Sequence, residues 1–206
     1  MIAPTNLDEM FGSIDIYLFD QLLRGRLPRG INILDAGCGS GRNIRYLMDA
    51  GHEVFAVDED ADAVSGVMRM AGELNPSLPA SNFRREAVEL ISFPAASMDA
   101  VLSIAVLHFA RSDAQFSAML EAMWGVLKPG GLFFCRLASN IGMESRMVKR
   151  EGRRFLLPDG SERYLVDEEL LLEWTARLGG KLADPLKTTI VQDQRCMTTW
   201  VLRKAA

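Results

Sequence analysis

The sequence has few cysteines and no long uncharged hydrophobic run. Its three cysteines, Cys38, Cys135 and Cys196, are scattered along the chain and form no C-x-x-C pair. We therefore expect no disulfide framework and no metal site, and the pattern fits a reducing compartment. No apolar run approaches the roughly 20 residues that a membrane-spanning helix needs. No basic and apolar leader follows Met1, so we expect a cytoplasmic protein with no membrane partner.

A strong excess of positive charge is also absent. Lys and Arg together number 23 against 27 Asp and Glu, which gives a formal net charge of -4. This balance argues against wholesale nucleic-acid binding, so no nucleic acid partner is expected. With 206 residues, of which 49% are hydrophobic, the chain can bury the core of one α/β domain and is too short for two comfortable ones. We predict a single domain over 1–206, whereas the oligomeric state has no sequence signal.

Runs typical of strands alternate with helical spacing along the chain. We predict helices over 6–24, 42–50, 61–74, 114–127 and 167–178. We predict strands over 31–35, 52–57, 83–87, 100–105, 132–137, 188–191 and 197–202. This alternation indicates a mostly parallel sheet with helices on both faces.

A glycine-rich loop stands where the first predicted strand meets the first helix after it. It reads Asp35-Ala-Gly-Cys-Gly-Ser-Gly-Arg-Asn43. Glycines permit positive φ and let the backbone approach a ligand, and doubly wound sheets bind nucleotides at this place. A helix N-terminus beyond the loop offers N–H groups to an anion. The glycine spacing differs from the G-x-G-x-x-G of dinucleotide folds, which disfavours an NAD(P)-dependent oxidoreductase and leaves another nucleotide as an alternative.

With an acid two residues before its first glycine, the loop resembles the first motif of class I S-adenosylmethionine-dependent methyltransferases. Through Gly41-Arg42-Asn43 it is also similar to their tellurite-resistance branch. The resemblance covers about residues 22–137. It implies a Rossmann-like, three-layer doubly wound α/β fold with a mostly parallel seven-stranded sheet and an antiparallel last strand. It also implies S-adenosyl-L-methionine as the cofactor.

The same resemblance assigns the cofactor contacts. It places the methionyl part on the glycine loop and Asp35, the ribose on Asp58, and the adenine on Glu86 and Ala87. A carboxylate at the end of the second strand can accept two hydrogen bonds from a ribose diol. For Glu86 the alternative is a surface charge beside Arg84 and Arg85. The predicted cofactor-binding residues are Asp35, Gly37, Cys38, Gly39, Gly41, Arg42, Asp58, Glu59, Glu86, Ala87, Ser103, Val106 and Tyr17.

Two segments are candidates for covering the cofactor and binding the acceptor. Residues 1–27 are predicted to form a helical lid in which Phe11 and Tyr17 touch the cofactor or serve as ordinary core residues. Residues 140–166 are predicted to be a substrate-site insertion. Its basic residues, Arg153 and Arg154 among them, attract an anionic acceptor, or they lie on a solvated helix with Met143 and Met147 packed inward.

Methyl transfer from a sulfonium needs positioning and exclusion of water more than a protein nucleophile. His108 is the candidate general base, with packing or gating as the alternative. The chain has no Asp/Asn-Pro-Pro-Tyr/Phe and no Pro-Cys after the fourth strand. We therefore predict a methyltransferase that acts on a small molecule by in-line displacement. The alternatives are a protein or RNA acceptor, and a non-catalytic S-adenosylmethionine-binding sensor or scaffold protein.

Overall fold

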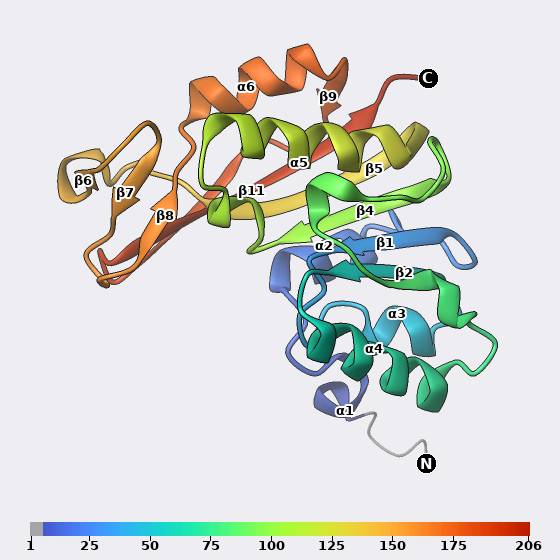
Figure 1. The fold of residues 1–206 in the computed structure, drawn as a ribbon. Coiled ribbons are helices and arrows are strands. Elements are labelled where there is room, and N and C mark those ends of the chain that lie inside the picture. The colour runs from blue at the N-terminus through green and yellow to red at the C-terminus, as the bar shows by residue number, and fades with distance from the viewer. Residues whose placement is uncertain (1–5) are drawn as a thin grey trace.

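One large mixed sheet forms the centre of the computed structural model, which describes residues 6–206 (Figure 1). The strand order is β10-β11-β5-β4-β1-β2-β3, and β9 pairs with β11 outside this path. The pairs from β5 through β3 are parallel, whereas β11 is antiparallel to β5, β9 and β10. The predicted fold class is confirmed, with β9 as an eighth strand. The strands are β1 (Asn32–Ala36), β2 (Glu53–Asp58), β3 (Phe83–Arg85), β4 (Met98–Ile104), β5 (Leu127–Ala138), β9 (Gly180–Leu182), β10 (Lys187–Val191) and β11 (Arg195–Lys204).

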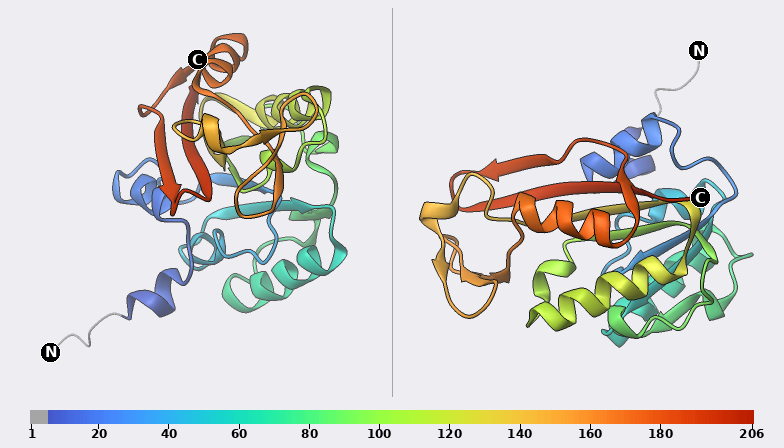
Figure 2. Two further views of the ribbon diagram at one scale, coloured as in Figure 1. Left: turned by 90° about the vertical axis from the view of Figure 1, so that its left-hand side faces the viewer. Right: turned by 90° about the horizontal axis from the view of Figure 1, so that it is seen from above.

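Helices cover both faces of this sheet, as Figures 1 and 2 show. In β1, Ile33 belongs to the buried cluster that includes residues of α2, α3 and α4, while the next residue, Leu34, belongs to the cluster that includes residues of α5 and α6. Successive side chains of a strand point to opposite faces, so both faces of this buried strand are apolar. The result is a three-layer arrangement. The helices are α1 (Leu7–Phe11), α2 (Ile16–Leu23), α3 (Arg45–Asp49), α4 (Ala61–Leu74), α5 (Asp113–Val126) and α6 (Glu168–Arg177).

The N-terminal segment differs from the single helix predicted over 6–24. It forms two helices, because Gly12 has a φ of 53° and Asp15 caps a new helix by accepting hydrogen bonds from the amides of Tyr17 and Leu18. The predicted cap at the start is present, since the Glu9 amide donates to Asn6 Oδ1 at 3.4 Å. The predicted lid also includes residues 1–5, which lie outside the described residues.

Residues 140–166, called the arm below, project from the end of β5 (Figure 1). The arm contains a short 3-10 turn and a three-stranded antiparallel sheet, so the alternative of a solvated helix is wrong. Met143 and Met147 are nevertheless buried against Leu157 and Cys196, as that alternative expected. Pro158 and Gly160 favour a turn between strands, and Gly160 has a φ of 80°. The strands are β6 (Val148–Lys149), β7 (Arg154–Leu156) and β8 (Glu162–Tyr164).

Element boundaries shift most where glycine or a turn residue interrupts a pattern. Residues 128–131, predicted as a turn, form a bulge within β5. Met98 of β4 pairs with Leu127, and Ala100, only two residues further along β4, pairs with Leu132. Strand β3 ends at Arg85, two residues before the predicted end. Over residues 6–206, no helix has both the length and the apolar character that crossing a bilayer requires.

Candidate active site

The glycine loop turns sharply at the end of β1. The amides of Gly37 and Cys38 both donate to the carbonyl oxygen of Val57 on the neighbouring strand, at 2.9 and 3.0 Å. Gly37 has a φ of 83°, and a Cβ there would lie 2.5 Å from a methyl of Val106. Only glycine fits such a position without strain. The loop is therefore held against the ends of both β2 and β4.

The other two glycines of the motif have different tasks. A Cβ on Gly41 would lie 2.4 Å from Met70 Cε and 2.9 Å from Val67 Cγ2, so this glycine allows α4 to pack against the loop. A Cβ on Gly39 would meet no atom within 4 Å, although its φ is 50°. Gly39 lines the open cavity described next, whereas Gly41 does not.

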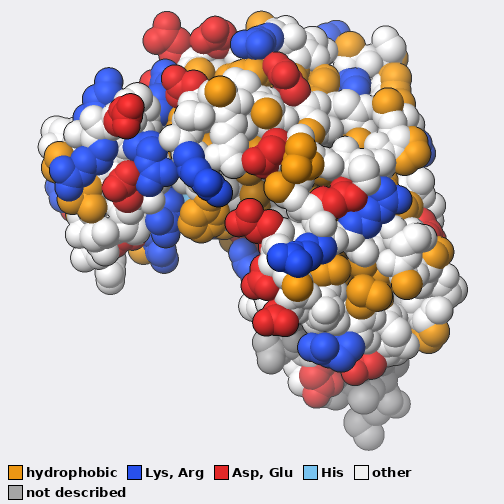
Figure 3. Space-filling model, in the orientation of Figure 1, with side chains coloured by type: hydrophobic (Ala, Val, Ile, Leu, Met, Phe, Trp, Pro, Cys, Tyr) orange, Lys and Arg blue, Asp and Glu red, His pale blue; other side chains and the backbone are white. Residues whose placement is uncertain are grey.

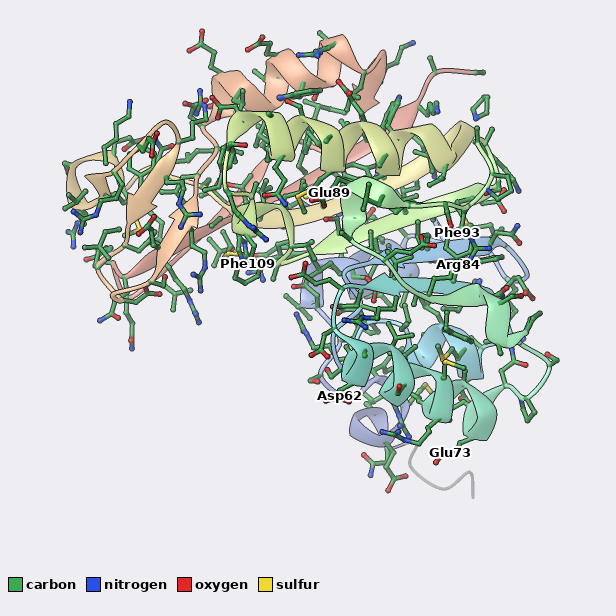
Figure 4. All side chains as sticks on the ribbon, viewed as in Figure 1. Asp62, Glu73, Arg84, Glu89, Phe93 and Phe109 are labelled. Atoms are coloured by element: carbon green, nitrogen blue, oxygen red, sulfur yellow. The ribbon has the colours of Figure 1, made fainter. Side chains whose placement is uncertain are left out.

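A cavity of about 490 Å³ lies over the carboxyl ends of β1, β2 and β4. Figure 4 shows Glu89 beneath α5 and Phe109 near the corner where the arm leaves the rest of the fold. Open α/β sheets bind ligands in this crevice. The lining residues are Gly37, Cys38, Gly39, Ser40, Arg42, Asn43, Asp58, Glu59, Ala87, Val88, Glu89, Ile104, Ala105, Val106, Phe109, Arg111, Gln115 and Met119.

Asp58 is fixed by the backbone around it. Its Oδ2 accepts a hydrogen bond from the Gly39 amide at 2.8 Å, and its Oδ1 accepts one from the Asp60 amide at 3.0 Å. A carboxylate has about four lone-pair positions, so both oxygens can accept further bonds. A diol facing this cavity therefore meets an oriented pair of acceptors.

Asp35 is buried directly behind the glycine loop. Its side chain is only 1% exposed, and Oδ2 has no hydrogen-bond partner among the residues that the structure describes. Burial raises the pKa of this carboxyl to about 7, with Arg42 opposing the shift and Asp58 adding to it. Asp35 does not itself line the cavity, but it lies two residues before Gly37, which does. An unpartnered buried oxygen behind such a loop fits the ammonium group of an amino acid. This is the observation by which the site fits a methionyl ligand.

Several other predicted residues also line the cavity. Arg42 does so while its guanidinium donates to the Ser13 carbonyl at 2.8 Å, which ties the loop to the segment before α2. Burial raises the pKa of the Cys38 thiol, so this cysteine remains a neutral thiol that contributes shape. Glu59 and Ala87 complete the predicted contacts on the β2 and β3 side.

Glu86 turns away from the cavity, and Glu89 takes the place expected of it. The carboxylate of Glu86 accepts hydrogen bonds from the amide and hydroxyl of Ser92, as expected of a local surface contact. Glu89 lies on the 3-10 turn after β3 and accepts a 2.7 Å bond from Gln115 Nε2 on α5. Glu89, Gln115, Asn43, Phe109 and Arg111 were missed from the sequence. Glu89 carried a signal as a second acid after the third strand, and Asn43 as the last residue of the loop motif.

Tyr17 and Ser103 also lie outside the cavity lining. Tyr17 donates or accepts a hydrogen bond with Thr189 of β10, and the Arg136 guanidinium carbon lies 5.2 Å from its ring centroid. Phe11 packs edge-on against Phe19. Ser103 is fully buried on β4. Contact with a cofactor stays a prediction for all the predicted residues, those that line the cavity included.

A second cavity of about 270 Å³ adjoins the first and shares Ala105 with it. Ala105 has a φ of 62°, a left-handed conformation that is uncommon for a residue with a Cβ and recurs at functional sites. Ends of β4 and β5, the arm and the β10–β11 hairpin enclose this space. Its lining residues are Ala105, His108, Arg136, Ala138, Leu157, Asp159, Ser161, Arg163, Val191, Arg195 and Met197.

His108 faces the second cavity instead of the first. Its Nδ1 accepts a hydrogen bond from the Ala138 amide at 3.2 Å, which assigns the proton of the neutral ring to Nε2. Burial lowers the pKa of His108 to about 4, and the charge of Arg163 acts in the same direction. The imidazole is therefore neutral near pH 7, with its one lone pair engaged by the backbone.

The sheet order, the glycine loop and the acid at the end of β2 define a doubly wound α/β protein with a nucleotide-type site over the strand ends. Residues 34–135 match the family described as methyltransferase domain. Ubiquinone biosynthesis O-methyltransferase of Methylocella silvestris is 34% identical over 105 residues, which are 51% of this chain and 39% of that enzyme. tRNA 5-carboxymethoxyuridine methyltransferase of Escherichia coli is 27% identical over 186 residues, covering 84% of this chain and 69% of that enzyme.

Among solved structures, 1,6-didemethyltoxoflavin-N1-methyltransferase of Burkholderia thailandensis has a TM-score of 0.71. It is 20% identical, and the match covers 98% of this chain and 82% of that one. The chain belongs to the class I S-adenosylmethionine-dependent methyltransferases, whose cofactor is S-adenosylmethionine. It spans less than half the length of the first of the curated relatives named above.

Proposed function

We propose that the protein transfers a methyl group from S-adenosylmethionine to a small-molecule acceptor by in-line displacement. One observation carries the proposal: a glycine-loop cavity and a second cavity meet at Ala105. A donor site and an acceptor site must adjoin if two bound molecules are to react. S-adenosylmethionine supplies the activated methyl group when it is bound.

The residues of the first cavity bind and orient. Gly37 and Gly39 line the cavity and let the backbone approach the methionyl part. Asp35, buried behind the loop, offers its unpartnered oxygen to the ammonium group. Asp58 accepts from the ribose hydroxyls with a carboxylate already held by two amides. Ala87 and Glu89 lie where the base end of a nucleoside is expected.

A small molecule is favoured over RNA by the charges of the arm. Three of its basic residues are engaged in ion pairs: Arg146 with Asp193 at 2.9 Å, Arg153 with Asp167 at 2.8 Å, and Arg154 with Glu162 at 2.7 Å. Paired arginines are poor contacts for a phosphate backbone, which binds by releasing counterions from unpaired cations. In Figure 3 Asp and Glu side chains lie among the Lys and Arg of the arm, although Lys and Arg predominate there.

The names of the relatives do not decide between these acceptor classes, because they include a tRNA methyltransferase as well as methyltransferases of ubiquinone biosynthesis and of didemethyltoxoflavin. The enzyme should therefore be incubated with methyl-labelled S-adenosylmethionine and, separately, the small-molecule and RNA fractions of a cell extract. We expect label in small molecules, and loss of that label in Asp58→Ala.

Label confined to RNA would contradict the small-molecule acceptor. Retained binding of S-adenosylhomocysteine with no transfer to any fraction would instead favour a non-catalytic binding protein. Binding of NAD(P) in place of S-adenosylhomocysteine, measured by calorimetry, would overturn the assignment of the cavity itself.

A further inference from the structure

We propose that the acceptor is an organic acid, bound in the second cavity as its carboxylate anion and methylated on a carboxylate oxygen to give a methyl ester. This inference rests on the proposed function and narrows its substrate class. It is carried by three features of the second cavity: its cations, its contact with the donor cavity, and the weak basicity of the side chains that could accept a proton.

The cations come from three separate elements. Arg136 lies on β5, Arg163 on β8 and Arg195 at the start of β11, and the one acid in the lining is Asp159. Asp15, outside the lining, pairs with Arg136. Arg163 and Arg195 against Asp159 still leave an excess of positive charge, which attracts an anion. Guanidinium groups also match a carboxylate with two parallel hydrogen bonds.

Two of these arginines have no ion pair within residues 6–206. Arg163 donates to the backbone carbonyl of Glu162, and the exposed Arg195 has no side-chain hydrogen bond or ion pair in that range. Arg136 pairs with Asp15 at 3.1 Å, yet its Nε is buried and has no hydrogen-bond partner among the described residues. Unsatisfied buried donors are uncommon and call for a partner such as a ligand or water.

Anion contacts from Arg153 and Arg154 were expected from the sequence, but the structure places both residues in ion pairs outside the two cavities. Arg153 is paired with Asp167, which caps α6, and Arg154 is paired with Glu162 across the β7–β8 pair. Neither residue lines either cavity. We assign anion binding instead to Arg163, which follows Glu162 on β8, and to Arg195, because both line the second cavity.

The cationic cavity lies directly against the donor cavity. Ala105 belongs to both linings, and the Arg163 guanidinium carbon lies 4.9 Å from the ring centroid of Phe109, which lines the first cavity. A carboxylate held by Arg163 therefore lies near the wall that the two sites share.

The two side chains of the second cavity that could accept a proton, His108 and Asp159, are poor acceptors. The lone pair of His108 is engaged by the Ala138 amide. Hydrogen bonds from Ser161 to Oδ1 lower the pKa of Asp159, with Arg195 and Arg163 contributing through their charge. A hydroxyl acceptor has to lose a proton as it is methylated, and an ammonium has to lose one before it reacts.

A carboxylate has no such requirement. One of its oxygens forms a bond to the methyl carbon while the carbon–sulfur bond breaks, and that electron pair stays on sulfur as the sulfonium becomes a thioether. The negative charge of the acid and the positive charge of the sulfonium disappear together, and no proton moves. The groups of the cavity fit this reaction and fit a proton-releasing one poorly.

Methyl esters can be recognised because mild alkali releases their methyl group as volatile methanol. The full-length protein is incubated with tritiated-methyl S-adenosylmethionine and the small-molecule fraction of a cell extract, and volatile and non-volatile label are counted after alkali treatment. We expect most of the transferred label in the volatile fraction. We also expect that converting the carboxylates of the extract to amides, with a carbodiimide and methylamine, abolishes it.

Two charge-removing variants test the cavity. Arg195→Gln lowers the initial rate at limiting acceptor about tenfold or more, the expected effect of losing one charged hydrogen bond. Arg150→Gln is the matched control, since Arg150 is exposed on the arm and lines neither cavity. S-adenosylhomocysteine affinity is unchanged in both variants.

Each negative result of these experiments overturns a different claim. Label that resists alkali overturns the carboxylate inference and leaves the methyltransferase proposal standing. Equal rates for Arg195→Gln and Arg150→Gln overturn the assignment of the acid to this cavity. Absence of label from every fraction, with S-adenosylhomocysteine still bound, overturns the proposed function itself.

Discussion

Asp58 Oδ2 accepts a 2.8 Å hydrogen bond from the backbone amide of Gly39. This bond joins the acid at the end of β2 to the middle of the glycine loop at the end of β1. Two features that are 19 residues apart in the sequence therefore form one preorganised surface, and loss of the carboxylate disturbs both the ligand contacts and the loop.

Asp58→Asn tests this relationship. The amide cannot supply two anionic acceptors, so we expect S-adenosylhomocysteine to bind roughly ten- to a hundredfold more weakly, the cost of one charged hydrogen bond or more. Calorimetry measures the affinity. Glu73→Gln on the exposed side of α4 is the control, and an equal loss in both variants would point to overall charge as the cause.

Gly37→Ala and Gly39→Ala separate folding from binding. A Cβ on Gly37 overlaps Val106 and requires a φ of 83°, so we expect a loss of about 2 to 5 kcal/mol in the free energy of unfolding. Gly39→Ala meets no protein atom and costs less stability, but it fills part of the cavity and weakens S-adenosylhomocysteine binding. Denaturant titrations beside calorimetry distinguish the two effects. A Val106→Ala change that recovers none of the stability of Gly37→Ala would contradict the overlap.

Cofactor binding should release protons from Asp35. With a pKa of about 7, this carboxyl is largely protonated at pH 6 in the unliganded protein. A bound ammonium favours the carboxylate and lowers that pKa, so up to about one proton per ligand leaves at pH 6 and fewer leave above pH 8. Calorimetry in buffers of different ionisation enthalpy measures the release. Asp35→Asn abolishes it, and a pH-independent release in that variant would assign the proton elsewhere.

The pH dependence of the reaction should lack an imidazole step. Because the pKa of His108 is lowered to about 4, kcat/KM has no inflection from this residue between pH 6 and 8. His108→Asn keeps an acceptor for the Ala138 amide and retains activity within about tenfold, whereas loss of a general base costs about a hundredfold or more. A hundredfold loss together with an inflection near pH 6.5 would restore the general base role.

The lowered pKa of His108 also makes the stability of the fold depend on pH. The ring stays neutral in the folded protein but becomes protonated below pH 6.5 in the unfolded chain, so this group lowers stability as the pH falls from about 6.5 to 4. His108→Asn removes that part of the pH dependence. Thermal unfolding over this range measures it.

The sequence predicted the elements whose signals are local. The loop from Asp35 to Gly41 and the acid Asp58 sit at strand ends that apolar runs mark clearly, and the structure places Asp58 and Gly39 in contact. Helix α4 begins and ends where its spacing predicted, from Ala61 to Leu74.

The sequence-based predictions fail where contacts between separate segments determine which way a side chain points or where a helix ends. Glu86 and Glu89 are both acids after β3, and only the 3-10 turn at Val88–Leu90 determines which one faces the cavity. No periodicity reveals that Arg153 pairs with Asp167, which caps α6 outside the arm, while Arg163 bonds only the carbonyl of the preceding residue. Likewise, Gly12 and Asp15 outweigh the helical spacing of the N-terminal residues.

The position of β11 in the sheet affects the order in which the sheet forms while the chain is synthesised. β10 meets β5 only through β11, which pairs with both. During synthesis the half of the sheet that carries the glycine loop is complete long before β11 leaves the ribosome, whereas β5 waits with an unpaired edge. We therefore expect the nucleoside half to mature first, and chains that stall before Arg195 to be prone to aggregation.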